Sequence, residues 1–152
     1  MLIHTARAIL KKPVAAFADA EFERLLNENT RTTFDSLRDG GLIVAIGTSL
    51  TAGTSLGYAT DTCKKSPADE LTRMIARELD ARGITVNHIA PYPLDNSFSH
   101  TGETPESSAF GASLAPSGGL GTEADIVPVV TNPVAEEGGW TNGQTLFVNG
   151  SL

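Results

Sequence analysis

Two kinds of apolar pattern alternate along this chain. The first is a short run rich in apolar and β-branched residues, found at residues 2–5, 42–46, 84–90 and 145–148. Runs of this length and composition are typical of strands that neighbouring elements cover on both faces. The second pattern places apolar side chains three and four positions apart, and it predicts amphipathic helices over residues 19–38 and 66–82.

The segment from residue 42 to residue 90 follows the order strand, helix, strand with short connections. Such a βαβ unit pairs its two strands in parallel through a right-handed crossover. Ser66 and Pro67 are favoured at an N-cap and at the first helical position, so the central helix is expected to begin there and to end at Gly83. We therefore predict an α/β fold, a partial Rossmann-like, doubly wound parallel sheet in three αβα layers. The length of 152 residues fits a single domain, residues 1–152.

The stretch after this βαβ unit is rich in Pro, Gly, Ser and Thr. Its central part, residues 94–121, is predicted to be a long loop, and a loop of this length in a compact domain is usually either a substrate-covering segment or a disordered one. Thr122 and the acidic residues after it indicate the start of another helix, which Pro133 is expected to cut short.

The composition argues against several classes of function. A formal net charge of -7 without a Lys/Arg stripe argues against nucleic-acid binding. No apolar run approaches the length of a membrane span, so no membrane contact is expected. The three histidines fall in no metal-ligand spacing, so no metal site is expected. The single cysteine, Cys63, excludes an internal disulfide and fits a reducing compartment, so we expect a cytoplasmic protein.

The segment Leu71–Pro93, LTRMIARELDARGITVNHIAPYP, is the most specific of five stretches that match one known pattern in order. The other four are LIHTA, FERLLNENTRTTF, GGLIVAIGTS, and DIVPVV followed by GGWTNGQTLFVNG. Together they resemble the short-chain dehydrogenase/reductase family, from the end of its fourth strand to near its C-terminus. The resemblance implies an oxidoreductase that transfers a hydride between NAD or NADP and a small carbonyl or alcohol substrate. The family's glycine-rich nucleotide-binding unit has no counterpart in the sequence, so we expect a truncated form.

The resemblance assigns catalytic roles to three residues. Asn29 falls on the family's asparagine, Thr48 on the hydroxyl residue that binds the substrate oxygen, and Lys65 on the lysine. Asp61 replaces the tyrosine that is the family's general acid/base, and its spacing from Lys65 predicts a salt bridge worth about a few tenths of a kcal/mol. Tyr58 lies three residues earlier and is expected to point elsewhere. We therefore predict the family's framework with weakened chemistry, so that catalysis by this chain is doubtful.

On the cofactor side, the resemblance assigns Lys65 to the ribose and Pro91, Tyr92 and Asn96 to the nicotinamide end. Tyr92 takes the place of a glycine that lets backbone approach the nicotinamide, and Asn96 takes the place of a threonine. Without the glycine-rich turn a pyrophosphate has no site in this sequence, so the prediction is that the chain binds NAD or NADP weakly.

A serine hydrolase is an alternative from a different class. Residues 53–57, GTSLG, match the pattern of a nucleophile elbow with Ser55 as the nucleophile. His88 or His100 would be the base and Asp95 its orienting partner. The predicted strand ends well before Ser55, however, and His88 falls in a predicted buried strand, so the sequence favours the oxidoreductase.

A non-catalytic module is the third hypothesis. Asn29 falls on the apolar face of its predicted helix, where the spacing alone favours a satisfied core amide over a functional one. Helices 19–38 and 66–82 resemble the helices through which members of the family pack against a second subunit. The resemblance therefore implies a homo-oligomer or association with a full-length relative; the alternative is that these apolar faces serve only the chain's own core.

Overall fold

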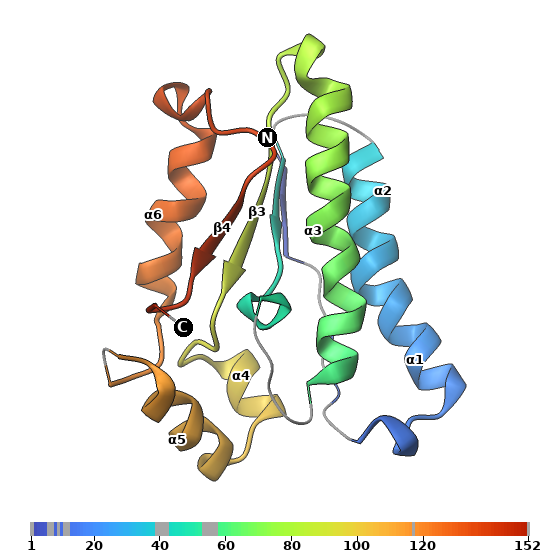
Figure 1. Cartoon of the computed structure of the whole chain (residues 1–152), viewed down its shortest axis with the longest axis vertical. Coiled ribbons are helices and arrows are strands. Elements are labelled where there is room, and N and C mark those ends of the chain that lie inside the picture. Colours follow the sequence, from blue (N-terminus) through green and yellow to red (C-terminus); the bar gives the residue numbers. More distant parts are fainter. Residues whose placement is uncertain are drawn as a thin grey trace.

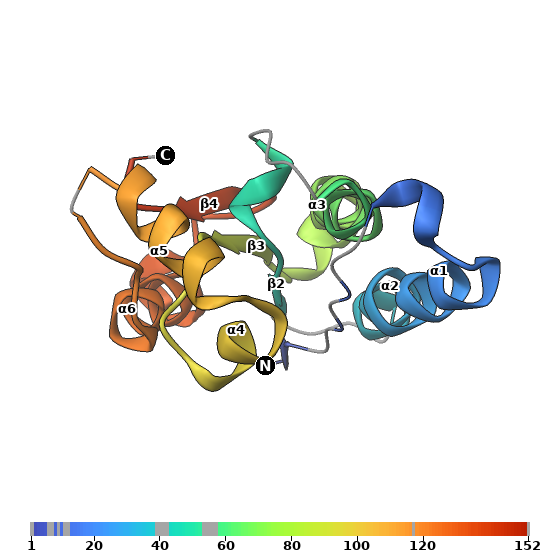
Figure 2. The ribbon, with the colours of Figure 1, turned by 90° about the horizontal axis from the view of Figure 1, so that it is seen from below.

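The computed structural model describes residues 2–5, 8, 10, 13–38, 43–52, 58–116 and 118–151. Within them, four strands form one parallel sheet in the order β1-β2-β3-β4, with bounds Leu2–His4, Ile43–Ile46, Val86–Pro91 and Thr145–Val148. Helices lie on both faces of the sheet, with α1, α2 and α3 on one side and α6 on the other (Figures 1 and 2). The predicted three-layer αβα arrangement and the parallel βαβ unit are confirmed.

The two central strands carry the core, as their apolar runs predict. Every residue of β3 is buried, and in β2 only Ile46 is partly accessible. Ile43 and Val86 pack with Ala76 of α3, and further apolar side chains surround this cluster: Leu71, Ile75, Leu79 and Ile84. The outer strand β4 is only partly buried, and it packs mainly against β3 and α6.

The helix predicted over residues 19–38 is present, with an interruption that the spacing did not predict. It consists of α1 (Asp19–Leu26), a π-helical segment (Asn27–Arg31) and α2 (Thr32–Arg38). These three parts follow one another along nearly one axis beside α3 (Figure 1). A π-helical segment widens the backbone locally and is frequent at functional sites.

The central helix begins seven residues before the predicted start. Helix α3 runs from Ala59 to Leu79, and Pro67 lies inside it. A proline leaves the carbonyl four residues earlier without its backbone donor, and here that carbonyl belongs to Cys63. The Ser66 hydroxyl donates to the Cys63 oxygen at 3.5 Å, which replaces part of the lost bond. The helix ends in a 3₁₀ turn before Gly83, whose positive φ of 67° fits the predicted stop.

The predicted long loop at residues 94–121 instead contains two helices, α4 (Ser97–Gly102) and α5 (Pro105–Leu114). The Asn96 side chain caps the first by accepting from the Ser99 amide at 3.1 Å. The Thr104 side chain caps the second by accepting from the Ser107 amide at 3.2 Å. Asn and Thr are favoured N-caps, and Pro is favoured at the first helical position. The sequence of this Pro- and Ser-rich stretch therefore did contain signals for two helix starts.

Helix α6 (Glu123–Val134) begins where Thr122 predicted it, but Pro133 does not cut it short. Pro128 and Pro133 both lie inside the helix, which ends one residue after Pro133. The helix packs on β3 and β4, and the Pro133 side chain is fully buried. A proline inside a helix removes one backbone hydrogen bond. Here the burial of its apolar ring offsets that loss, whereas a proline in an exposed helix would gain no such stabilisation.

Candidate active site

A narrow cleft lies at the carboxyl ends of β2 and β3, where the N-terminus of α3 and the α4–α5 segment meet. In open α/β sheets ligands bind at this end of the strands. The cleft encloses about 60 Å³. It brings together Thr48, Lys65 and Asp61, as the resemblance implies. Its other lining residues are Gly47, Leu50, Tyr58, Pro91, Tyr92, Pro93, Leu94, Phe98, Ser99 and Glu103.

Asn29 lies behind the cleft rather than on its wall. Its side chain is buried within the π-helical segment, and its Nδ2 donates to the Leu25 oxygen at 2.7 Å and to the Ala8 oxygen at 3.3 Å. Its Oδ1 accepts from the Ala8 amide at 3.2 Å. The amide is therefore satisfied, and it fixes the chain that follows β1 against the helix.

Asp61 is held between two lysines. Its Oδ1 lies 2.9 Å from the Lys64 Nζ and its Oδ2 lies 3.1 Å from the Lys65 Nζ. The predicted Asp61–Lys65 pair is thus confirmed, and it is buried, because the Asp61 side chain is only 4% exposed. The sequence reasoning missed Lys64, which is fully buried and donates from Nζ to the Ala8 oxygen at 2.6 Å. Its position three residues after Asp61 was the available signal.

This arrangement gives residue 61 a role different from that of a tyrosine. A carboxylate that pairs with two ammonium groups accepts hydrogen bonds and has no proton to donate. Asp61 instead fixes the position of Lys65, whose Nζ reaches the cleft wall. The family's proton donor therefore has no equivalent at this position.

Tyr58 lines the same cleft, so the prediction that it points elsewhere is wrong. Its hydroxyl donates to Oε1 of Glu103, and Oε2 of the same carboxylate accepts from the Ser107 hydroxyl. Burial raises the pKa of Tyr58 above its usual value, and the hydrogen bond to Glu103 raises it further. A hydroxyl with a raised pKa is a poor proton donor at neutral pH. The sequence reasoning did not pair Tyr58 with Glu103, because 45 residues separate them.

Thr48 is buried at the end of β2, where its Oγ1 accepts from the Leu50 amide at 3.3 Å. The residue before it must be glycine, because a Cβ on Gly47 would lie 2.0 Å from Nε2 of His88. The His88 ring is fully buried against Gly47, and this burial lowers the pKa of His88. His88 therefore fixes the backbone that presents Thr48 and does not stand exposed as a hydrolase base would.

Tyr92 separates the cleft from a second cavity of about 120 Å³, since its side chain lines both. Pro91 ends β3 and is buried, and Asn96 caps α4 and lies outside the lining of the cleft. Ligand pockets commonly enclose about 300–1,000 Å³. Both cavities are smaller than this.

The comparisons with known proteins agree with this geometry. The family model described as enoyl-(acyl carrier protein) reductase matches residues 1–151. NADPH-dependent aldehyde reductase 2 of Arabidopsis thaliana is 31% identical over 138 residues, which cover 85% of this chain and 51% of that protein. A short-chain type dehydrogenase/reductase of Picea abies is 30% identical over 146 residues, 90% of this chain and 54% of that protein. This chain belongs to the short-chain dehydrogenase/reductase family.

A solved member of the short-chain dehydrogenase/reductase family extends the agreement to the fold. A proposed dehydrogenase of Burkholderia cenocepacia, solved with bound NADP, is 30% identical with a TM-score of 0.92. The match covers 97% of this chain and 60% of that one. The chain thus spans about half the length of the curated relatives it matches.

The remaining sequence predictions concern features outside the cleft. Ser55 and the rest of residues 53–57 lie outside the described residues. His100 and Asp95 do form a pair, with Nε2 2.8 Å from Oδ1, but both side chains are exposed. In the described part of this short-chain dehydrogenase/reductase, no cluster of His, Cys, Asp and Glu suits a metal ion. None of its described helices is long and apolar enough to cross a membrane.

Proposed function

We propose that this chain supplies the carbonyl-binding part of a short-chain oxidoreductase that uses NADP or NAD. The observation that carries the proposal is the meeting of Thr48 and Lys65 in one buried cleft at the carboxyl ends of the strands. The Arabidopsis relative is named as NADPH-dependent, and the Burkholderia structure holds NADP. These names support a nicotinamide cofactor and a small carbonyl or alcohol substrate for this chain.

In this proposal the chain's own residues bind and orient the carbonyl group. The Thr48 hydroxyl and the Lys65 ammonium group are donors for the carbonyl oxygen, and Asp61 holds Lys65 in place. Leu50, Leu94 and Phe98 line the apolar part of the cleft. Segment 94–121 contributes the last two, which supports its proposed role as the substrate-covering segment. We assign no proton transfer to Asp61, so the chain binds the carbonyl group and does not catalyse its reduction through residue 61.

Backbone NMR on the 15.9 kDa chain tests the carbonyl site directly. We expect saturable chemical-shift changes at Thr48 and Lys65 when benzaldehyde is titrated, and about tenfold weaker binding in Lys65→Met, because the variant loses a cationic donor. Arg82→Met, a similar change at an exposed position in the 3₁₀ turn after α3, is expected to bind like the wild type. Absence of any saturable shift at the cleft would refute the carbonyl site.

Turnover is tested separately, by NADPH absorbance at 340 nm with the same aldehyde. We expect no turnover above background by the wild-type chain. Turnover that the change Asp61→Asn abolishes would contradict our assignment of residue 61.

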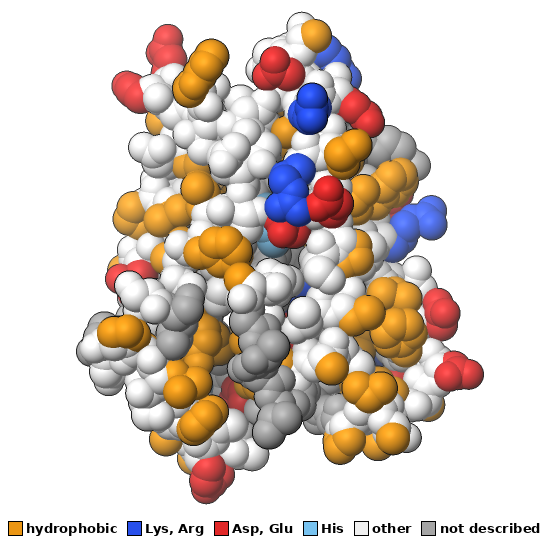
Figure 3. Space-filling model, in the orientation of Figure 1, with side chains coloured by type: hydrophobic (Ala, Val, Ile, Leu, Met, Phe, Trp, Pro, Cys, Tyr) orange, Lys and Arg blue, Asp and Glu red, His pale blue; other side chains and the backbone are white. Residues whose placement is uncertain are grey.

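We also propose that the chain forms a homo-oligomer through α1–α2 and α3. Phe34 on α2 and Met74 on α3 are 42% and 54% exposed, so these helices present large apolar side chains to solvent. Charged side chains of both signs gather over the middle of α3 (Figure 3). A surface that carries both signs can pair with its own copy about a two-fold axis.

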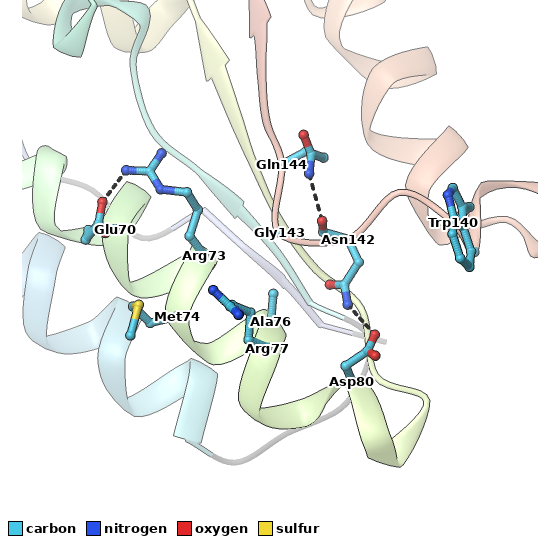
Figure 4. A pocket seen from close by; sticks show the side chains of 11 residues that line it. Glu70, Arg73, Met74, Ala76, Arg77, Asp80, Trp140, Asn142, Gly143 and Gln144 are labelled. Carbon is cyan, nitrogen blue, oxygen red and sulfur yellow. Dashed lines mark hydrogen bonds and ion pairs between the residues drawn. The ribbon is translucent and has the colours of Figure 1, made fainter.

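An open hollow of about 730 Å³ adjoins this face. It lies between α3 and the segment before β4, with Arg73 and Arg77 on one side and Trp140 on the other (Figure 4). Trp140 is 100% exposed. Trp, Met and Arg are enriched at protein interfaces, which supports a second copy as the occupant.

Light scattering after size-exclusion chromatography tests the oligomer. We expect a multimer for the wild type and a monomer for Met74→Glu, whereas Val127→Glu on α6 should remain multimeric. A monomeric wild type would exclude the assembly. The proposed compartment is the cytoplasm, although the Arabidopsis relative is named as chloroplastic, and a fluorescent fusion would distinguish the two.

A further inference from the structure

The cleft is narrow in this structure. Its volume of about 60 Å³ lies well below the roughly 300–1,000 Å³ of common ligand pockets. A second cavity of about 120 Å³ lies on the far side of Tyr92 and Leu94, which line both spaces. A ligand larger than a few atoms therefore enters only if part of the wall moves.

One side-chain contact joins the two walls of the cleft. Tyr58 is the N-cap residue of α3, and Glu103 lies in the connection between α4 and α5. The Tyr58 hydroxyl donates to one carboxylate oxygen of Glu103, and Ser107 of α5 donates to the other. The carboxylate thus links the start of α3 to α5 across the opening of the cleft.

The Tyr58–Glu103 contact is partly buried. Burial and the Glu103 carboxylate raise the pKa of Tyr58, and the same two causes raise the pKa of Tyr92. A hydroxyl that donates to a carboxylate in a partly buried site forms one of the stronger side-chain hydrogen bonds. None of the side chains described in α5 is buried, so this helix has no described side chain anchored in the core.

We infer that Tyr58 and Glu103 form a latch that holds the α4–α5 segment closed over the cleft, and that ligands enter when this hydrogen bond breaks. The inference rests on the proposed function only for the ligand that enters. The latch itself is a property of the chain without ligand. A hydrogen bond to a charged group shifts such an opening equilibrium about tenfold or more.

Hydrogen-deuterium exchange of the ligand-free chain tests the latch. In Tyr58→Phe, which removes only the hydroxyl, we expect exchange about tenfold faster across residues 97–114 and unchanged exchange in β2 and β3. Tyr92→Phe removes the neighbouring hydroxyl of the same cleft, to which no hydrogen bond is assigned, and is expected to behave like the wild type. Glu103→Gln keeps an oxygen acceptor without the charge, so its exchange is expected to fall between the two.

Two outcomes of this experiment would overturn the latch. In the first, Tyr58→Phe exchanges like the wild type over residues 97–114. In the second, exchange rises equally in β2 and β3, which would make the contact part of global stability.

A second measurement separates the latch from the proposed function. Reduced nicotinamide mononucleotide and benzaldehyde are titrated into the wild type and Tyr58→Phe, with binding followed by NMR. We expect tighter binding to the variant by about the factor seen in exchange, because a ligand that needs the open state binds in proportion to its population. Faster exchange with equal affinities would overturn the control of access. Faster exchange with no binding by either protein would refute the proposed function and leave the latch itself established.

Discussion

The fully buried Lys64 offers the sharpest test of the arrangement around the cleft. Lys64→Met keeps a flexible side chain of similar length and removes the ammonium group. The change takes one of two cationic partners from Asp61 and one of two side-chain donors from the Ala8 oxygen. Removing one partner of a buried ion pair costs about 3–5 kcal/mol, because the other charge stays buried. Asp61 keeps Lys65, so we expect the lower end, a loss of about 3 kcal/mol in the free energy of unfolding.

Urea denaturation followed by circular dichroism measures this loss. Arg82→Met is the matched control, since it removes an exposed cation and should change stability by about 0.5 kcal/mol or less. Asp61→Leu alone leaves Lys64 buried without its counter-charge and should cost about 3–5 kcal/mol, whereas the double variant with Lys64→Met should recover most of that loss. A loss below about 1 kcal/mol for Lys64→Met would refute the reasoning, because that is the value of an exposed pair.

Three further predictions concern the buried groups near the cleft. Gly47→Ala should lower stability by about 1–3 kcal/mol, since its Cβ would lie 2.0 Å from His88, and His88→Ala should relieve much of the loss in a urea-denaturation cycle. Both Tyr58 and Tyr92 have raised pKa values, so absorbance at 295 nm should show no tyrosine ionisation near pH 10 in the folded chain and two ionisations in urea. The contribution of these two hydroxyl groups to the free energy of unfolding is present below pH 10 and is lost as pH rises above it. Because burial lowers the pKa of His88, its contribution is present above pH 6.5 and lost as pH falls below it, which urea denaturation between pH 7 and pH 5 should detect.

The strands could be predicted from the sequence because strands that are buried on both faces consist of continuous apolar runs. The helices could be predicted because their apolar residues recur three and four positions apart. Ile43 and Val86 lie in continuous apolar runs, and the structure buries both. The start of α3 was not readable, because the favourable N-terminal signal at Ser66 and Pro67 competed with the burial of residues before it. Lys64 and Asp61 fix that first part of the helix by tertiary contacts, and no local rule anticipates them.

Spacing along the sequence predicted only those contacts of the site that lie within one helix. The Asp61–Lys65 pair follows from a separation of four residues, which places both on one helix face. Spacing does not give burial, so the sequence did not predict that this pair is enclosed by the fold. The contact between Tyr58 and Glu103 joins two segments whose distance depends on the packing of α4 and α5. These two helices were expected to be a loop, so the contact had no basis in the sequence.

The aspartate that replaces the family's tyrosine is paired with a buried lysine, and this pairing affects any attempt to restore the tyrosine. Asp61 replaces the tyrosine beside the buried Lys64, and each balances the other's charge. We therefore expect Asp61→Tyr alone to destabilise the chain by about 3 kcal/mol or more, because it leaves the Lys64 ammonium group buried without a carboxylate. Combining it with Lys64→Met should recover most of that stability in urea denaturation, with Lys65 retained one helical turn after the new tyrosine. If Asp61→Tyr alone proves as stable as the wild type, the two positions are not coupled, and the tyrosine was replaced for a reason other than the charge of Lys64.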